Sequence, residues 1–158
     1  ARFHLQDKEM QFATGRHMCE GPFRHAFEVE DICGMVRAVY GQRVVFHDGD
    51  EEILPGISVH LIGGHTMGIQ SVRVNTRNGW LVLASDASHY YEHMRGKRFF
   101  SIAFNLGAML EGYQTLERLA DSPDHIIPGH DPLVMQWYPP ASEQLAGIAV
   151  RLDVEPSR

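Results

Sequence analysis

Three times in this sequence, a short apolar run ends in a tight turn that is followed at once by one metal-capable side chain. The three turns are Gly63-Gly64-His65, Ala84-Ser85-Asp86 and Pro128-Gly129-His130. Strand ends are rigid and glycine lets a backbone turn sharply, so each side chain is aimed with little freedom. The repeated design predicts an α/β protein that carries two imidazoles and a carboxylate at strand ends.

These residue types suit a borderline divalent ion such as zinc, and three protein ligands leave a position open for water. Such an ion lowers the pKa of water from about 15.7 to about 7. Each residue also has an ordinary explanation, because His after Gly-Gly and Asp after a strand are common in turns. From the residues alone, metal ligation and simple turn formation by His65, Asp86 and His130 both stay open.

The composition of the chain limits the kinds of molecule that it is expected to bind. The chain has 158 residues, 44% of them hydrophobic and 22% charged, which is the balance of one folded domain. Its net charge of −6 argues against nucleic acid and anionic membranes, which call for a basic stripe. No apolar run approaches the roughly 20 residues that span a bilayer. Cys19 and Cys33 form no disulfide framework, which favours a cytoplasmic location.

Hydrophobic periodicity divides the chain without a linker or repeat, so residues 1–158 are expected to belong to a single domain. Helices are predicted over residues 7–13, 29–39 and 106–120, with a short one after Pro139-Pro140. Strands are predicted over residues 1–6, 43–47, 57–62, 70–76, 80–84 and 125–127, with a hairpin turn at 77–79. Residues 14–27 and 88–102 have no clear period and are expected to be loops.

Three runs carry a family resemblance: Gly63–Ser71, Leu83–Ser88 and Ile127–Asp131. In order and content they resemble three successive motifs of the metallo-β-lactamase superfamily. Their spacing, 21 residues from His65 to Asp86 and 44 from Asp86 to His130, most closely resembles the N-acyl homoserine lactonase branch. The resemblance implies the C-terminal part of an αβ/βα sandwich.

The resemblance also implies a chemistry with two divalent metal ions, zinc being the expected choice. His65 would bind one ion, Asp86 would bridge both, and His130 would bind the other. A bridging hydroxide would attack a lactone carbonyl that the metals polarise. Asp131 would help to orient the ligands from a second shell. The expected partner is therefore a small-molecule lactone or ester, and a homodimer is left open.

The sequence departs from the family in one important motif. The His-x-His-x-Asp-His run that supplies the remaining ligands is absent, and His4, His17 and His25 lack the spacing to replace it. Ala1 is therefore expected to lie inside the fold, after that motif. With one ligand per metal and the bridge, the chain alone is expected to bind metal weakly or not at all.

A second departure lies near the substrate. The lactonases place a Tyr three positions after the bridging Asp, where it contacts the substrate carbonyl; here that position is His89, followed by Tyr90. Either His89 donates the hydrogen bond, or Tyr90 takes the role, or neither does and these aromatic residues only pack the loop.

Two other functions stay open. A glyoxalase-II-like thioesterase or another esterase would share the metal site, although Lys97 and Arg98 are the only nearby basic pair for glutathione carboxylates. A non-catalytic module that has lost its metals is the other alternative. The strands from Arg43 to Ala84 are expected to expose an apolar face or edge and to make the chain poorly soluble.

Overall fold

The structure is a computed structural model, and it describes residues 1–157. Its helices are α1 (Asp7–Thr14), α2 (Gly21–Arg24), α3 (Val29–Tyr40), α4 (Tyr91–Gly96), α5 (Leu106–Leu119) and α6 (Leu133–Trp137). Its strands are β1 (Phe3–Gln6), β2 (Val44–His47), β3 (Glu51–Leu54), β4 (Ile57–Leu61), β5 (Gln70–Thr76), β6 (Gly79–Ser85) and β7 (Ile126–Pro128). Short 3-10 turns cover Arg16–Cys19, Pro123–His125 and Glu143–Leu145.

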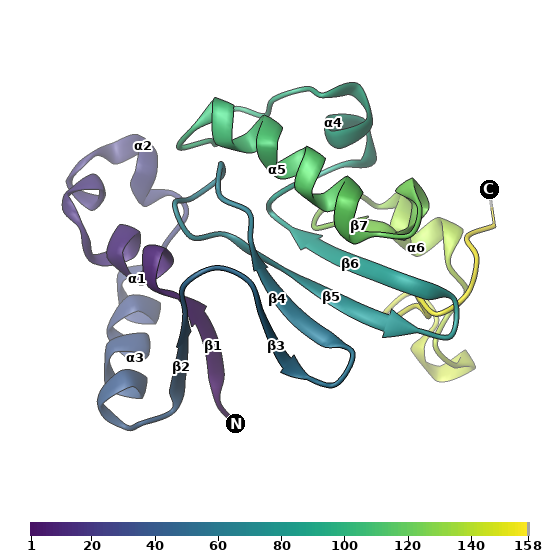
Figure 1. Ribbon diagram of the computed structural model, residues 1–158, viewed down its shortest axis with the longest axis horizontal. Coiled ribbons are helices and arrows are strands. Elements are labelled where there is room, and N and C mark those ends of the chain that lie inside the picture. Colours follow the sequence, from purple (N-terminus) through teal and green to yellow (C-terminus); the bar gives the residue numbers. More distant parts are fainter. Residues whose placement is uncertain (158) are drawn as a thin grey trace.

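The main sheet has the order β3-β4-β5-β6-β7, in which β7 alone pairs in parallel with its neighbour. The hairpin between β5 and β6 turns at Gly79, whose φ of 96° suits glycine, so the predicted turn at 77–79 is confirmed. A separate parallel pair, β1 with β2, stands beside this sheet and carries α1 to α3 (Figure 1).

The core lies between the main sheet and α5, which crosses one face of it (Figure 1). The centre of the predicted apolar stripe of α5 is buried at Met109, Tyr113 and Leu116, whereas Leu106 at its start is exposed. The side chain of Asn105 caps the first turn by accepting from the amide of Ala108. The buried residues of this core are Val82, Ala84, Ala87, Tyr91, Met94, Met109, Tyr113, Leu116 and Ile126.

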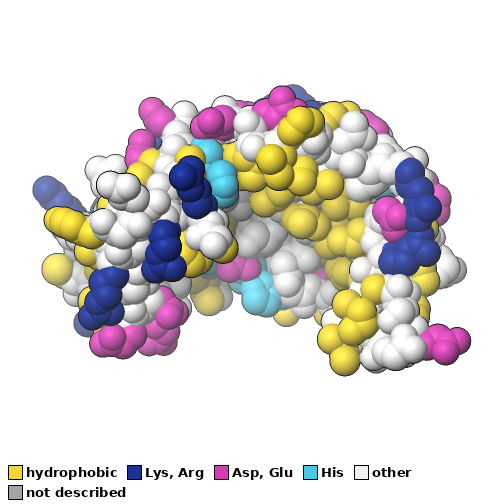
Figure 2. Space-filling view, turned by 90° about the horizontal axis from the view of Figure 1, so that it is seen from below, with side chains coloured by type: hydrophobic (Ala, Val, Ile, Leu, Met, Phe, Trp, Pro, Cys, Tyr) yellow, Lys and Arg dark blue, Asp and Glu magenta, His cyan; other side chains and the backbone are white. Residues whose placement is uncertain are grey.

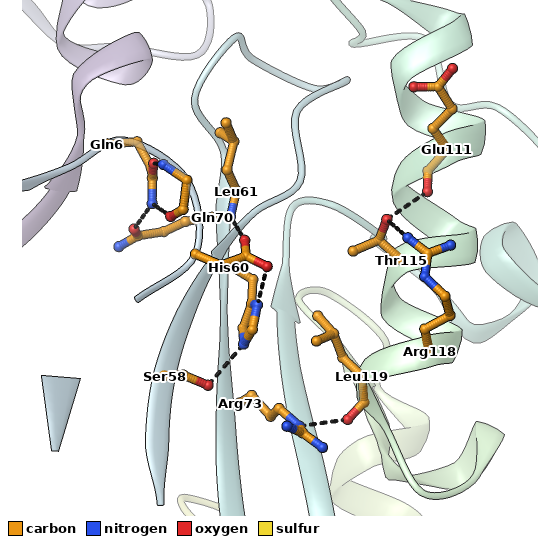
Figure 3. A network of polar contacts seen from close by, with 12 residues as sticks. Gln6, Ser58, His60, Leu61, Gln70, Arg73, Glu111, Thr115, Arg118 and Leu119 are labelled. Atoms are coloured by element: carbon orange, nitrogen blue, oxygen red, sulfur yellow. Dashed lines mark hydrogen bonds and ion pairs between the residues drawn. The ribbon is translucent and has the colours of Figure 1, made fainter. Parts of the chain in front are cut away.

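Polar contacts tie the sheet together on the same side (Figure 3). Buried His60 in β4 contacts the hydroxyl of Ser58 at 2.8 Å and the carboxylate of Asp50 at 2.9 Å. Arg73 in β5 donates to the carbonyl of Leu119 at the end of α5, at 2.7 Å. The Ser58 contact provides a partner for buried Nε2 of His60, and the Arg73 bond holds the end of α5 against the sheet.

The segment predicted as a loop over residues 14–27 is partly helical, since it contains α2 and the turn at Arg16–Cys19. Its apolar side chains gather around buried Phe12 of α1, where Phe23 and Phe27 meet it edge-on. Phe104, which precedes α5, joins the same cluster at 4.9 Å from the Phe12 ring. The segment is therefore ordered by long-range aromatic packing rather than by a local period.

Three further predictions are corrected. The strand β3 has no counterpart among the predicted elements, because its Glu-Glu-Ile-Leu sequence is mostly exposed and shows no clear alternation. The supposed loop 88–102 contains α4, which is only six residues long and too short to show a helical period. After Pro139-Pro140 the described residues hold a 3-10 turn in place of the expected helix.

The sheet face opposite α5 is only partly covered. The C-terminal segment packs on Leu81 and Ile127 at one end, and β1 and α1 stand at the other. Between them Leu83 is 37% exposed, beside a hollow that Leu5 and Val72 also line. Figure 2 shows this hollowed face with hydrophobic side chains gathered along it. The predicted exposure of an apolar face is present, and poor solubility stays a prediction.

No described helix has the length and apolar character to cross a membrane.

Candidate metal centre

The three predicted ligands lie where their strands end. His65 follows β4 through Gly63 and Gly64, whose φ angles of 74° and 98° explain the two glycines. Asp86 follows β6 directly after Ser85, which has a φ of 51°, a conformation that is uncommon outside glycine and typical of functional turns. His130 comes two residues after β7.

The carboxylate of Asp86 lies between the two histidines. Its Oδ1 accepts a hydrogen bond from Nε2 of His130 at 2.8 Å, and its Oδ2 lies 3.8 Å from Nε2 of His65. The two oxygens thus face different imidazoles. A bridging carboxylate would need this arrangement, although the bridging role itself remains a prediction.

The orientation of His65 is fixed by the backbone. Its Nδ1 donates to the carbonyl of Ile102 at 2.8 Å, because a carbonyl only accepts. Nδ1 therefore carries a proton, and Nε2 is the ring nitrogen that faces Asp86. Metal-binding histidines typically have such an outer hydrogen bond, which sets the tautomer. The side chain of His65 is 8% exposed, so its orientation is well restrained.

Backbone contacts bring the Asp86 loop and the His130 loop together. The amides of Gly129 and His130 donate to the carbonyls of Ser88 and His89, both at 3.0 Å. A side chain at Gly129 would place its Cβ 2.8 Å from the carbonyl oxygen of Ser85, so only glycine permits this approach. The carboxylate of Asp131 accepts hydrogen bonds from the amides of Tyr91 and Leu133, so this residue stabilises the loops and does not orient a ligand imidazole directly.

The structure adds His89 to this cluster. Ligand atoms of His65, Asp86 and His89 all lie within 4.8 Å of one another, and Nε2 of His89 is 3.9 Å from Oδ1 of Asp86. The His89 ring stacks on Phe100 with centroids 3.8 Å apart. Burial lowers the pKa of His89 to about 4, against the opposing charge of Asp86 and with the help of His130, His65 and His93. The ring is therefore neutral at pH 7, the form that binds metals.

Tyr90 does not belong to the ligand group, although its ring meets that of His89 edge-on with centroids 6.4 Å apart. It is 42% exposed and lines a separate depression together with Arg95 and Trp137. Its ring meets that of His93 edge-on, with centroids 5.1 Å apart. His93 falls in the segment predicted as a loop, but it lies in α4. Its ring stacks on Phe100, the same ring on which His89 stacks. Of the two residues proposed to contact substrate, His89 is the one beside Asp86.

The donor set fits a divalent cation. Imidazole nitrogens and a carboxylate are ordinary zinc ligands, and tetrahedral bonds of about 2.0–2.2 Å put neighbouring ligand atoms about 3.3–3.6 Å apart. The separations are 3.8 Å from His65 to Oδ2 of Asp86 and 3.9 Å from His89 to Oδ1, and one ligand atom from each residue lies within 4.8 Å of the other two. The side chains would have to draw together, by up to about an ångström, to complete tetrahedral coordination.

An apolar pocket of 530 Å³ adjoins the cluster, with His65 in its wall. The pocket is lined from two distant segments, the α1–α2 region and the loop before α5. Its other lining residues are Phe12, Gly21, Pro22, Phe23, His25, Ala26, Ser101, Ile102, Ala103 and Phe104. Sequence reasoning missed this pocket and Phe100, because their placement depends on contacts between segments that have no pattern of their own.

No protein-family model matches the chain, and no curated protein sequence matches it significantly. Solved structures do. An N-acyl homoserine lactone hydrolase with its product N-hexanoyl-L-homoserine bound at the catalytic metal centre matches with a TM-score of 0.67 and 23% identity, over 84% of this chain and 48% of its own. The dizinc quorum-quenching lactonase AidC matches at 0.58 and 18%, over 82% and 47%. The hydrolase AbOPH of the β-lactamase superfamily matches at 0.59 and 16%, over 84% and 48%.

At these identities the likeness establishes the fold. The chain has a metallo-β-lactamase-type α/β fold, as its three strand-end motifs predict, and its neighbours include N-acyl homoserine lactonases. It spans about half the length of these solved structures. The solved structures that share this fold include hydrolases, and this chain brings together the His-Asp-His group of His65, Asp86 and His89.

Proposed function

We propose that the protein is a metal-dependent hydrolase that opens a lactone of the N-acyl homoserine type. One observation supports this proposal most strongly: His65, Asp86 and His89 lie close together beside an apolar pocket, and His65 belongs both to this group and to the pocket wall. The likeness to solved lactonases supports the same function.

In this proposal His65, Asp86 and His130, with His89 beside them, would hold the divalent cations. A bound cation supplies a Lewis acid for the carbonyl and lowers the pKa of water. His65 is held in one tautomer by Ile102, so its orientation costs nothing during the reaction. The carboxylate of Asp86 is the anionic group at the centre of the cluster, placed to take a proton from an attacking water.

The pocket favours an acyl chain over a charged substituent. Its wall is built mainly from phenylalanine, alanine, proline and isoleucine, and it contains no Lys or Arg. A glutathione thioester would call for basic groups, but Arg98 is paired with Glu92 at the surface. An apolar chain of a lactone would be desolvated in this pocket, which is favourable by about 0.8 kcal/mol for each buried methylene.

Lactone opening by wild type and by Asp86→Asn tests the proposal. We expect the substitution to lower kcat/KM by at least about a hundredfold, as removal of a central charged group typically does. Asp48→Asn, a change at an exposed residue outside the cluster, is the matched control and should keep full activity. Wild-type rates in Asp86→Asn would contradict the proposal.

A parallel assay with a glutathione thioester separates the two hydrolase classes. We expect the lactone to be turned over with the higher kcat/KM, because the pocket is lined mainly by apolar residues and contains no Lys or Arg. A preference for the thioester would instead support the glyoxalase-II-like alternative.

A further inference from the structure

We propose that His89 is a metal ligand, and that His65, Asp86 and His89 form a complete three-ligand site for one divalent cation within this chain. The inference rests on the proposed metal-dependent function and deepens it, since it concerns the cation at the same site. It replaces the expectation that the chain has too few ligands to bind metal by itself.

The first argument is convergence. Three ligand atoms lie within 4.8 Å of one another, one from the loop after β4 and two from the loop after β6, and no other such group of His, Cys, Asp or Glu occurs among residues 1–157. Two imidazoles and one carboxylate, with a fourth position for water, form a common catalytic zinc site. The number and type of ligands in this chain are therefore sufficient for one ion.

The second argument is that both imidazoles are already oriented. Because Nδ1 of His65 donates its hydrogen bond to the carbonyl of Ile102, Nε2 is the ring nitrogen that can bind a metal ion. Stacking on Phe100, with rings 3.8 Å apart and 22° from parallel, holds the plane of His89. Pre-oriented ligands lose little rotamer freedom on binding, which favours affinity.

The third argument is that His130 is less suited than His89 to bind this cation. Its side chain is 56% exposed, whereas that of His89 is 17% exposed. Its Nε2 is already used in the hydrogen bond to Oδ1 of Asp86. A cation that bound Nε2 of His130 would have to displace the proton that this nitrogen donates to Asp86. We therefore assign the cation to His65, Asp86 and His89.

Zinc binding by the apo protein and three variants tests the assignment, with titration calorimetry for affinity and stoichiometry. His89→Phe keeps an aromatic ring on Phe100 but removes the nitrogen. His93→Phe is the matched control, because His93 also stacks on Phe100, at 5.2 Å, and does not belong to the ligand group. His89→Gln is a second variant in case the phenyl ring disturbs folding, which circular dichroism of each apo protein checks.

We expect wild type to bind one tight zinc ion per chain. His89→Phe and His89→Gln should weaken its affinity at least about a hundredfold, beyond the 10–100-fold that loss of an outer-shell partner costs. His93→Phe should stay within about threefold of wild type. Cobalt-loaded wild type should show visible absorption bands that change in the His89 variants and persist in His93→Phe.

The outcomes separate this inference from the proposed function. Full zinc affinity in a folded His89→Phe or His89→Gln protein overturns the inference, even if lactone opening is lost. Less than one tight ion per wild-type chain also overturns it. Conversely, tight zinc binding that depends on His89 supports it, even if no lactone is opened and the proposed function fails.

Discussion

The carboxylate of Glu9 accepts a hydrogen bond from the hydroxyl of Thr66 at 2.6 Å, although the two residues are 57 positions apart. The same oxygen accepts from the amide of Gly68 at 2.9 Å. Helix α1 thereby holds the loop that follows His65. Burial raises the pKa of Glu9, against the lowering effect of these two hydrogen bonds and of nearby His65.

Glu9→Ala should therefore loosen the His65 loop. Two donors lose their acceptor, and we expect a loss of about 1–3 kcal/mol in the free energy of unfolding, measured by urea denaturation. Glu9→Gln keeps one acceptor oxygen and should recover most of that loss. Lys8→Ala, on the exposed side of the same helix, should change stability by less than about 0.5 kcal/mol. Equal stability of Glu9→Ala and Lys8→Ala would show that the contact contributes nothing.

Gly68→Ala adds only one methyl group, but we expect it to destabilise the protein. A Cβ at this position would lie 2.1 Å from the backbone nitrogen of Glu9 and 2.5 Å from its Cα, so α1 would have to move. We expect a loss of stability of about 1–3 kcal/mol, together with weaker zinc binding, because the loop after His65 shifts.

The control for this substitution is Gly34→Ala in α3. Apart from its chain neighbours and the backbone of its own helix, no atom lies within 4 Å of a Cβ added there. Alanine in a helix interior is favoured over glycine by about 0.5–1 kcal/mol, so this variant should be slightly more stable than wild type. Thermal or urea denaturation of both variants compares them directly, and similar values for the two would refute the packing argument.

Local patterns predict the parts of this fold that have a period. The alternating strands β4 to β6 and the apolar stripe of α5 are where the sequence places them, and so are the strand ends that carry His65, Asp86 and His130. Each of these features depends on neighbours along the chain, so one sequence is enough to find it.

The features that sequence reasoning missed are set by distant contacts. Glu9 reads as an ordinary first-turn acid of a helix, and only the fold brings it to Thr66. His89 was identified by its position after Asp86, but its place among the ligand atoms depends on Phe100 and on the loop at Gly129. Neither partner has a local signal that links it to the site.

Alkaline stability should depend on Tyr113. This residue is fully buried, its hydroxyl donates to the carbonyl of Arg98 at 3.0 Å, and burial raises its pKa to about 12. A folded pKa above the ordinary value of 10 means that its contribution is fully present below pH 10 and is lost as pH rises through 12. Tyr113→Phe should cost about 0.5–1.5 kcal/mol near neutral pH.

The difference in unfolding free energy between wild type and Tyr113→Phe should therefore shrink as pH rises from 10 toward 12. Urea denaturation across this range measures it. Tyr40→Phe, at a tyrosine that is 87% exposed, should show no such convergence with wild type. A constant difference for Tyr113→Phe would show that its ionisation is not linked to folding.

Chain-length preference should follow the volume of the pocket beside His65. Ala26 lines that pocket, and phenylalanine in its place would fill part of the 530 Å³. If the pocket binds the acyl chain, Ala26→Phe should lower kcat/KM for a long-chain lactone by at least about tenfold, because two or more methylenes lose their burial at about 0.8 kcal/mol each. A short-chain lactone should be affected by less than about threefold. Ala146→Phe, at an exposed alanine that does not line the pocket, is the control and should leave both rates unchanged. An equal loss for both lactones in Ala26→Phe would place the acyl chain elsewhere.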